Sequence, residues 1–159
     1  MKRITCMTIL VAALVVVGYG PTHTTAAADS VTVTGAALAT FGQGAQLGSV
    51  SLSSLQLGTG VFIEPDGNAT GVYSAVLKGQ SLLGQSQQIT INGKVLNGEV
   101  APDGRVYLNG IARVDLGNGT PTISGVPFSV STIGNSVTLA IDSTALPAAQ
   151  LVGGNITIN

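Results

Sequence analysis

The chain has 159 residues, of which 8% are charged and 4% are aromatic, and its formal net charge is −1 at pH 7. Its six lysines and arginines form no basic patch, which argues against nucleic acid and anionic membrane surfaces as partners. The length fits one domain that can bury its core without disulfides or metal ions.

The first 28 residues carry the pattern of a Sec signal peptide. Lys2 and Arg3 form a positive start, an apolar run covers residues 4–18, and residues 26–28 form an A-x-A cleavage site. A membrane anchor is the alternative, but a spanning helix needs about 20 apolar residues. We therefore expect cleavage after Ala28, secretion to the periplasm or the cell exterior, and no membrane span in the remaining chain.

Cleavage at this point removes several kinds of reactive side chain. It would leave 159 − 28 = 131 residues without Cys, His, Met or Trp. These absences exclude disulfides, Cys or His nucleophiles, His general bases and the usual zinc or copper ligands. The sequence thus predicts a single domain over residues 29–159 with no cofactor and no catalytic residue.

Alternation of apolar and polar residues with a period of two predicts strands throughout residues 29–159. In chain order the predicted strands are 30–36, 49–57, 59–64, 71–79, 88–95, 105–116, 125–132, 136–142 and 154–159. One short helical turn is expected within 143–151. The side chains expected to face the core are Val31, Val33, Ala37, Ala39, Ile89, Ile91, Val95, Val106, Leu108, Ala112, Val114, Leu116, Val126, Phe128, Val130, Val137, Leu139, Ile141, Ile156 and Ile158.

Glycines interrupt the alternating pattern at several positions. Asn-Gly pairs at 92–93, 97–98 and 109–110 resemble hairpin turns. Gly110 also falls on the inner face of the predicted strand 105–116, where a glycine usually marks a bend or bulge. The sequence predicts an all-β antiparallel meander of roughly eight to ten strands, forming a small β-barrel or a two-sheet β-sandwich.

A repeated Pro-Asp-Gly motif is interpreted as a structural turn. Proline pre-sets the first turn position, aspartate suits the second, and glycine takes the left-handed position of a three-residue hairpin loop. The turn residues are Pro65, Asp66, Gly67, Pro102, Asp103 and Gly104.

A calcium site is the functional alternative for the first motif. Asp66, Asn68 and Thr70 match the first oxygen ligands of an EF-hand loop. The twelfth position of such a loop should be a bidentate glutamate, and here it is Leu77. The turn interpretation is therefore preferred over the metal site.

A glycoside hydrolase and an outer-membrane barrel are two further alternatives. Glu64 with Asp66, and Glu99 with Asp103, are candidate carboxylate pairs for glycoside hydrolysis. Acidic residues at hairpin tips also serve solvation, and aromatic platforms for a sugar are scarce. An outer-membrane barrel would need aromatic girdles, which the sequence lacks.

Three structural motifs follow one another in the second half of the chain: G-x-A-x-V, PF-x-V and G-x-I-x-I. Their residues here are Gly110, Ala112, Val114, Pro127, Phe128, Val130, Gly154, Ile156 and Ile158. From about Gly71 to Asn159 the chain thereby resembles uncharacterised small secreted bacterial all-β domains. The resemblance implies an exported β-domain and brings no activity or binding residues.

These observations favour a secreted, non-catalytic β-domain that acts as a structural, matrix or adhesive module. Its expected partners are a surface or a second copy of the chain, because an open strand edge permits pairing between chains. The alternative is a carrier of a small apolar ligand inside a barrel, since inward Ala37, Ala39, Gly110 and Ala112 would leave room. A small secreted hydrolase is the third hypothesis.

Overall fold

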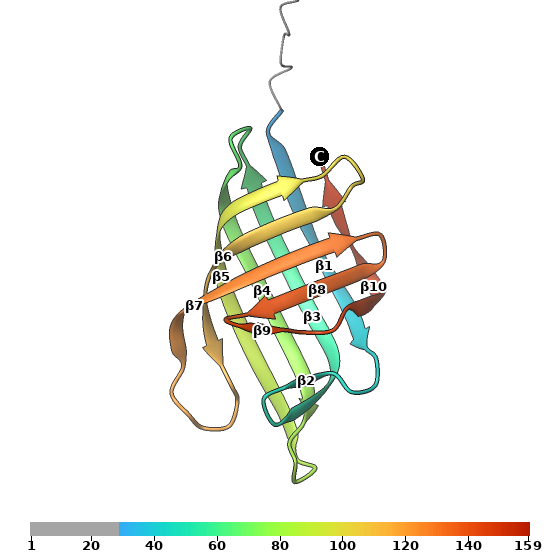
Figure 1. The fold of residues 1–159 in the computed structure, drawn as a ribbon, viewed down its shortest axis with the longest axis vertical. Coiled ribbons are helices and arrows are strands. Elements are labelled where there is room, and N and C mark those ends of the chain that lie inside the picture. The colour runs from blue at the N-terminus through green and yellow to red at the C-terminus, as the bar shows by residue number, and fades with distance from the viewer. Residues whose placement is uncertain (1–28) are drawn as a thin grey trace, which may run out of the picture.

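The computed structural model describes residues 29–159, so the expected signal peptide and most of its cleavage junction lie outside the described residues. Within that range the chain is all-β, and every strand pairing is antiparallel, which confirms the predicted fold class (Figure 1). The strands are β1 (Val31–Phe41), β2 (Gln46–Leu47), β3 (Val50–Ile63), β4 (Asn68–Gln80), β5 (Ser86–Val100), β6 (Val106–Asp115), β7 (Ile123–Ile133), β8 (Ser136–Ile141), β9 (Thr144–Ala145) and β10 (Ala149–Ile158).

The strand pairings close into a ring. Strands β3 to β8 follow one another as a meander, β10 pairs with both β8 and β1, and β1 pairs with β3. The short strands β2 and β9 lie off this ring, on β3 and β8. The seam is weakest between β8 and β10, which share only the residue pairs Val137–Ala149 and Ser136–Gln150 among the described residues.

The ring is flattened into two layers. Strands β6, β7 and β8 cross obliquely over the layer that contains β1, β3 and β4 (Figure 1). The long strand β5 pairs with β4 on one side and β6 on the other, and its pairing with β6 shifts register between Val95 and Asn97. Bulges of this kind let a strand bend from one layer into the next. The fold therefore combines barrel-like closure with sandwich-like layers.

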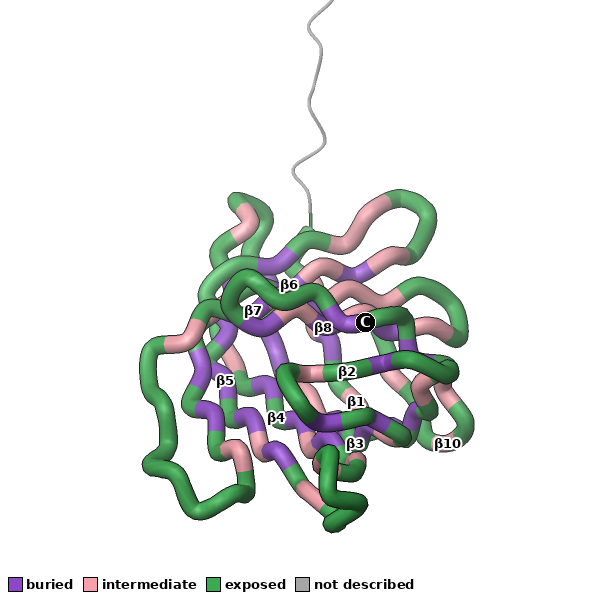
Figure 2. Tube along the Cα trace, turned by 60° about the horizontal axis from the view of Figure 1, so that its bottom comes forward, coloured by how far each residue is buried: buried purple, intermediate pink, exposed green. Residues whose placement is uncertain are grey.

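Buried apolar side chains form one core cluster, and Figure 2 shows the buried residues along the strands. Leu55, Leu77 and Ile91 are fully buried. Tyr73 stacks on Phe128 with ring centroids 5.4 Å apart. Most of the side chains that were predicted to face the core are buried. In β6 these are Val106, Leu108, Ala112 and Val114.

Three predictions about the strands were wrong. Segments 49–57 and 59–64 form one continuous strand, β3, because its neighbours β1 and β4 both pair along it without a break at Gly58. Segment 143–151 contains no helical turn and instead holds β9 and the start of β10. Ile158 was expected in the core but is 39% exposed, because β10 is paired only with β1 at that end.

The Asn-Gly pairs are not turns either. Those at 92–93 and 97–98 lie inside β5, and the pair at 109–110 lies inside β6. A Cβ atom on Gly93 would stand 2.5 Å from the Phe128 ring. A Cβ atom on Gly110 would stand 2.9 Å from the same ring and 2.0 Å from the carbonyl oxygen of Lys94. These glycines are therefore explained by close packing against Phe128 and between strands.

Candidate binding site at the β4–β5 hairpin

Three hairpin loops share one turn geometry. They connect β3 to β4, β4 to β5, and β5 to β6. In each loop a glycine with positive φ donates its N–H to the carbonyl three residues earlier, in the pairs Gly67–Glu64 (3.0 Å), Gly84–Ser81 (2.9 Å) and Gly104–Ala101 (2.9 Å). Left-handed glycine at this position is what a three-residue hairpin loop requires.

The two Pro-Asp-Gly motifs occupy the first and third of these loops. The Asp66 carboxylate accepts the N–H of Asn68 at 2.9 Å, and the Asp103 carboxylate accepts the N–H of Arg105 at 3.0 Å. Side-chain bonds to the backbone two residues ahead are typical of Asx turns. The motifs thus lie at hairpin tips with their aspartates bonded within the loop.

The calcium candidates Asp66, Asn68 and Thr70 lie on this first loop and the start of β4. The second Asp66 carboxylate oxygen accepts a hydrogen bond from the Asn68 side-chain amide. Between residues 29 and 159, no three His, Cys, Asp or Glu side chains gather closely enough to hold a metal ion. Asp66 is thus engaged by Asn68 within the loop, as the turn interpretation expects.

Of the carboxylates weighed for hydrolysis, Glu64, Asp66 and Asp103 lie in these loops, whereas Glu99 lies inside β5, opposite Tyr107. Asp103 forms an ion pair with Arg105 at 3.5 Å. Arg105 also donates to the Tyr107 hydroxyl at 2.7 Å, and this hydrogen bond raises the pKa of Arg105. Asp103 is therefore bound into a local polar cluster of the β5–β6 hairpin.

The middle loop, between β4 and β5, carries two leucines where the other two loops carry proline and aspartate. Leu82 is 84% exposed and Leu83 is 85% exposed. The loop is held by hydrogen bonds from Ser81 N to Gln85 O (2.9 Å) and from Gln85 N to the Ser81 hydroxyl (3.3 Å). We call Leu82 and Leu83 the leucine tip. Sequence reasoning missed it because leucine is not a turn-forming residue and gives no turn signal.

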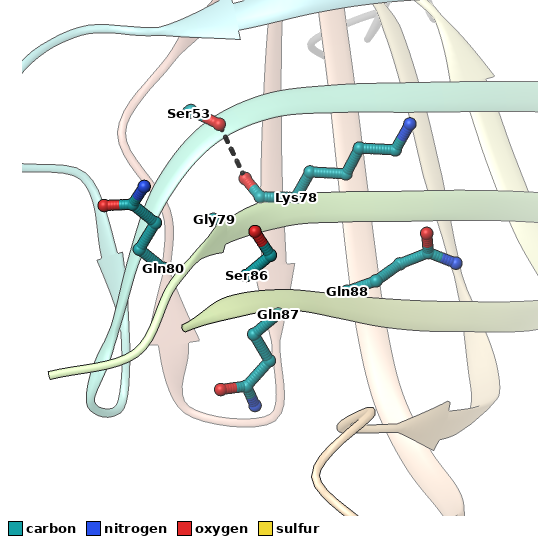
Figure 3. A pocket seen from close by; sticks show the side chains of 7 residues that line it. All are labelled: Ser53, Lys78, Gly79, Gln80, Ser86, Gln87 and Gln88. Carbon is teal, nitrogen blue, oxygen red and sulfur yellow. Dashed lines mark hydrogen bonds between the residues drawn. The ribbon is translucent and has the colours of Figure 1, made fainter. Parts of the chain in front are cut away.

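A polar hollow of about 320 Å³ lies on β3, β4 and β5 next to this loop (Figure 3). It forms where the pairing of β3 with β4 shifts register between Leu52 and Ser54. Gly79 permits this close approach, because a Cβ atom there would lie 2.1 Å from the Ser51 carbonyl oxygen. The lining residues are Ser53, Lys78, Gly79, Gln80, Ser86, Gln87 and Gln88.

The side chains of the hollow are suited to hydrogen bonding. The Ser53 hydroxyl donates to the Lys78 carbonyl oxygen at 3.1 Å, while the Lys78 and Gln88 side chains extend side by side along the sheet (Figure 3). Gln87 points away and donates to the Leu116 carbonyl oxygen at 2.8 Å. Amide, hydroxyl and ammonium groups offer both donors and acceptors to a polar ligand.

A second hollow, which we call the end cleft, is apolar. Its volume is about 380 Å³, and Asp142 is its single charged lining residue among those described. Ligand pockets typically have volumes of roughly 300–1,000 Å³ and mostly apolar walls. The cleft is lined by Leu47, Val114, Leu116, Ile123, Ser124, Gly125, Val126, Pro127, Ile141 and Asp142.

A small void lies between the layers. It lies beside Tyr73 and measures about 10 Å³, close to the smallest volume that holds one water molecule. The Tyr73 hydroxyl is buried and has no hydrogen-bond partner among the described residues. Burial raises the pKa of Tyr73 well above its usual range.

No family model, curated protein or solved structure matches this chain. Residues 29–159 form no apolar helix of membrane-spanning length.

Proposed function

We propose that this protein is an exported, non-catalytic β-domain that acts as an adhesive module outside the cytoplasm. The signal-peptide pattern of residues 1–28 supports export. The observation that carries the adhesive role is the leucine tip, in which two large apolar side chains are held almost fully exposed on a hydrogen-bonded loop.

The setting of the leucine tip supports contact with a partner. Interfaces commonly bury a central apolar anchor and surround it with polar groups that form hydrogen bonds. Leu82 and Leu83 supply such an anchor, and the adjacent hollow supplies Ser53, Lys78 and Gln88. Covering the two leucines with a partner would favour binding by about 1.5–3 kcal/mol for each leucine that becomes fully buried.

Replacing both leucines with serine should reduce adhesion by at least about tenfold, because the apolar area that drives it is removed. The protein would be purified as its host processes it, labelled, and titrated onto intact host cells. Its melting temperature should stay unchanged, because the replaced side chains are exposed. Val72→Ser is the matched control, since Val72 is 65% exposed on β4 but lies outside the hairpin loop. Equal binding by the L82S/L83S variant and the wild type would refute the proposal.

The end cleft supports a second candidate, a carrier of a small apolar ligand. The void of about 10 Å³ between the layers weighs against a ligand there, whereas the end cleft has the size and apolar lining of a ligand pocket.

Native mass spectrometry of protein purified gently from its own host tests this candidate. A carrier should show an added mass that organic extraction removes. Ile123→Asp, at a half-exposed position of the cleft wall, should abolish that mass because it places a charge in the apolar site. A bare protein mass in every preparation would exclude a bound ligand and leave the adhesive proposal standing.

A further inference from the structure

Strand β10 has an open edge over its second half. Its pairing with β8 stops at Gln150. The last hydrogen bonds on that side are made by Leu151. Its N–H donates to the Asn135 carbonyl at 2.9 Å, and its carbonyl accepts the Asn135 side-chain amide at 2.8 Å. From Val152 to Ile158, the described part of the chain gives β10 one neighbour only, β1.

The register shows which backbone groups face the open side. Asn159 and Thr32 exchange two hydrogen bonds, at 2.8 and 3.0 Å. In an antiparallel pair the bonded residues alternate with residues whose backbone points away. The N–H and C=O groups of Ile156 and Ile158 therefore point away from β1, toward the open edge. Gly154 follows the bulge and has a positive φ of 81°.

This edge carries a β-bulge at Val152, but beyond the bulge it lacks the other usual protections against pairing with another chain. Natural edge strands are commonly guarded by lysine, proline, inward charges or a covering segment. The sequence of β10, AQLVGGNITI, contains no charged residue and no proline. Val152 is 64% exposed and Ile158 is 39% exposed, and Figure 2 shows exposed and half-buried residues along this strand.

We propose that β10 pairs with β10 of a second copy of this protein across a two-fold axis. An antiparallel partner centred on Ile156 opposes Ile156 to itself and Ile158 to Gly154. New backbone hydrogen bonds would form at the central Ile156 pair and at the outward groups of Ile158. The absence of charge along the strand means that two copies approach without like-charge repulsion. This pairing goes beyond the adhesive role and uses a different surface.

Ile156→Pro tests the pairing, because its N–H points away from β1 and proline is tolerated at such edge positions. Sedimentation velocity over a concentration series should show a wild-type dimer whose dissociation constant rises at least about tenfold in the proline variant, from loss of central hydrogen bonds. Ile156→Val is the matched control, since it keeps the N–H, and should dimerise as the wild type does. Ile158→Lys provides a second disruption at a partly exposed position.

A cysteine pair tests the register itself. The only native cysteine is Cys6, within the expected signal peptide. In the proposed register the two copies of residue 156 face each other at a Cα separation of about 5.5 Å, within disulfide range. Oxidation should therefore cross-link I156C but not N155C. A wild type that stays monomeric, or a dimer that survives both I156P and I158K, would overturn the pairing and leave adhesion by the leucine tip unaffected.

Discussion

Replacing Gly110 with alanine is expected to destabilise the fold by about 3 kcal/mol, the upper part of the range for overpacked cores. The new methyl group would lie 2.0 Å from the Lys94 carbonyl oxygen and 2.9 Å from the Phe128 ring. The carbonyl belongs to the neighbouring strand β5, so relief would require the β5–β6 pairing to shift.

Gly60→Ala is the matched control for this prediction. Gly60 also lies inside a strand, β3, but nothing stands within 4 Å of its added Cβ atom. Alanine there should stabilise the protein by about 0.5–1 kcal/mol, because glycine loses more backbone freedom on folding. Urea denaturation monitored by circular dichroism measures both variants. If the free energy of unfolding of Gly110→Ala fell by less than the error of the method, the close approach of β5, β6 and Phe128 would be wrong.

Tyr73 should make the protein increasingly unstable at alkaline pH. In the unfolded chain a tyrosine ionises near pH 10, whereas burial raises the pKa of Tyr73 in the folded protein. Above pH 10 the unfolded state therefore binds fewer protons, and the stability contributed by Tyr73 is lost as pH rises. The slope rises toward about 1.4 kcal/mol per pH unit above pH 10, so about 2.3 kcal/mol is lost between pH 10 and pH 12.

Tyr73→Phe should remove this part of the alkaline loss. At neutral pH it should also stabilise the fold by about 1 kcal/mol, because the buried hydroxyl has no hydrogen-bond partner in the described chain. Denaturant titrations of both proteins at pH 7, 10, 11 and 12 measure the two effects. A variant that is less stable than the wild type at pH 7 would instead show that the hydroxyl is satisfied, as by a water in the adjacent void.

Period-two alternation predicted the inner faces well wherever strands have neighbours on both sides. In β6 and β8, the predicted valines, leucines and isoleucines are buried. The pattern failed at Ile158, because alternation reports a preferred face and not whether a neighbouring strand is present to cover it. An open edge depends on the pairing of β8 with β10, which no local pattern reports.

Glycines and leucines account for the remaining differences between the turns predicted from the sequence and those in the structure. The pair Asn92-Gly93 has the composition of a turn, but Gly93 lies against Phe128, which is 35 residues later in the chain. Such a long-range contact overrides a local turn signal. Conversely, Leu82 and Leu83 adopt a turn without any turn-forming side chain of their own, because Ser81 and Gly84 supply its hydrogen bonds.

The central claim is that the leucine tip contacts a partner outside the cytoplasm. Placing a photo-crosslinking amino acid at position 83 in the host, with position 72 as control, tests it most directly. The account predicts a discrete cross-linked product from position 83 on intact cells and none from position 72, because only the hairpin loop would touch the partner. No product from position 83, or the same product from both positions, would contradict it.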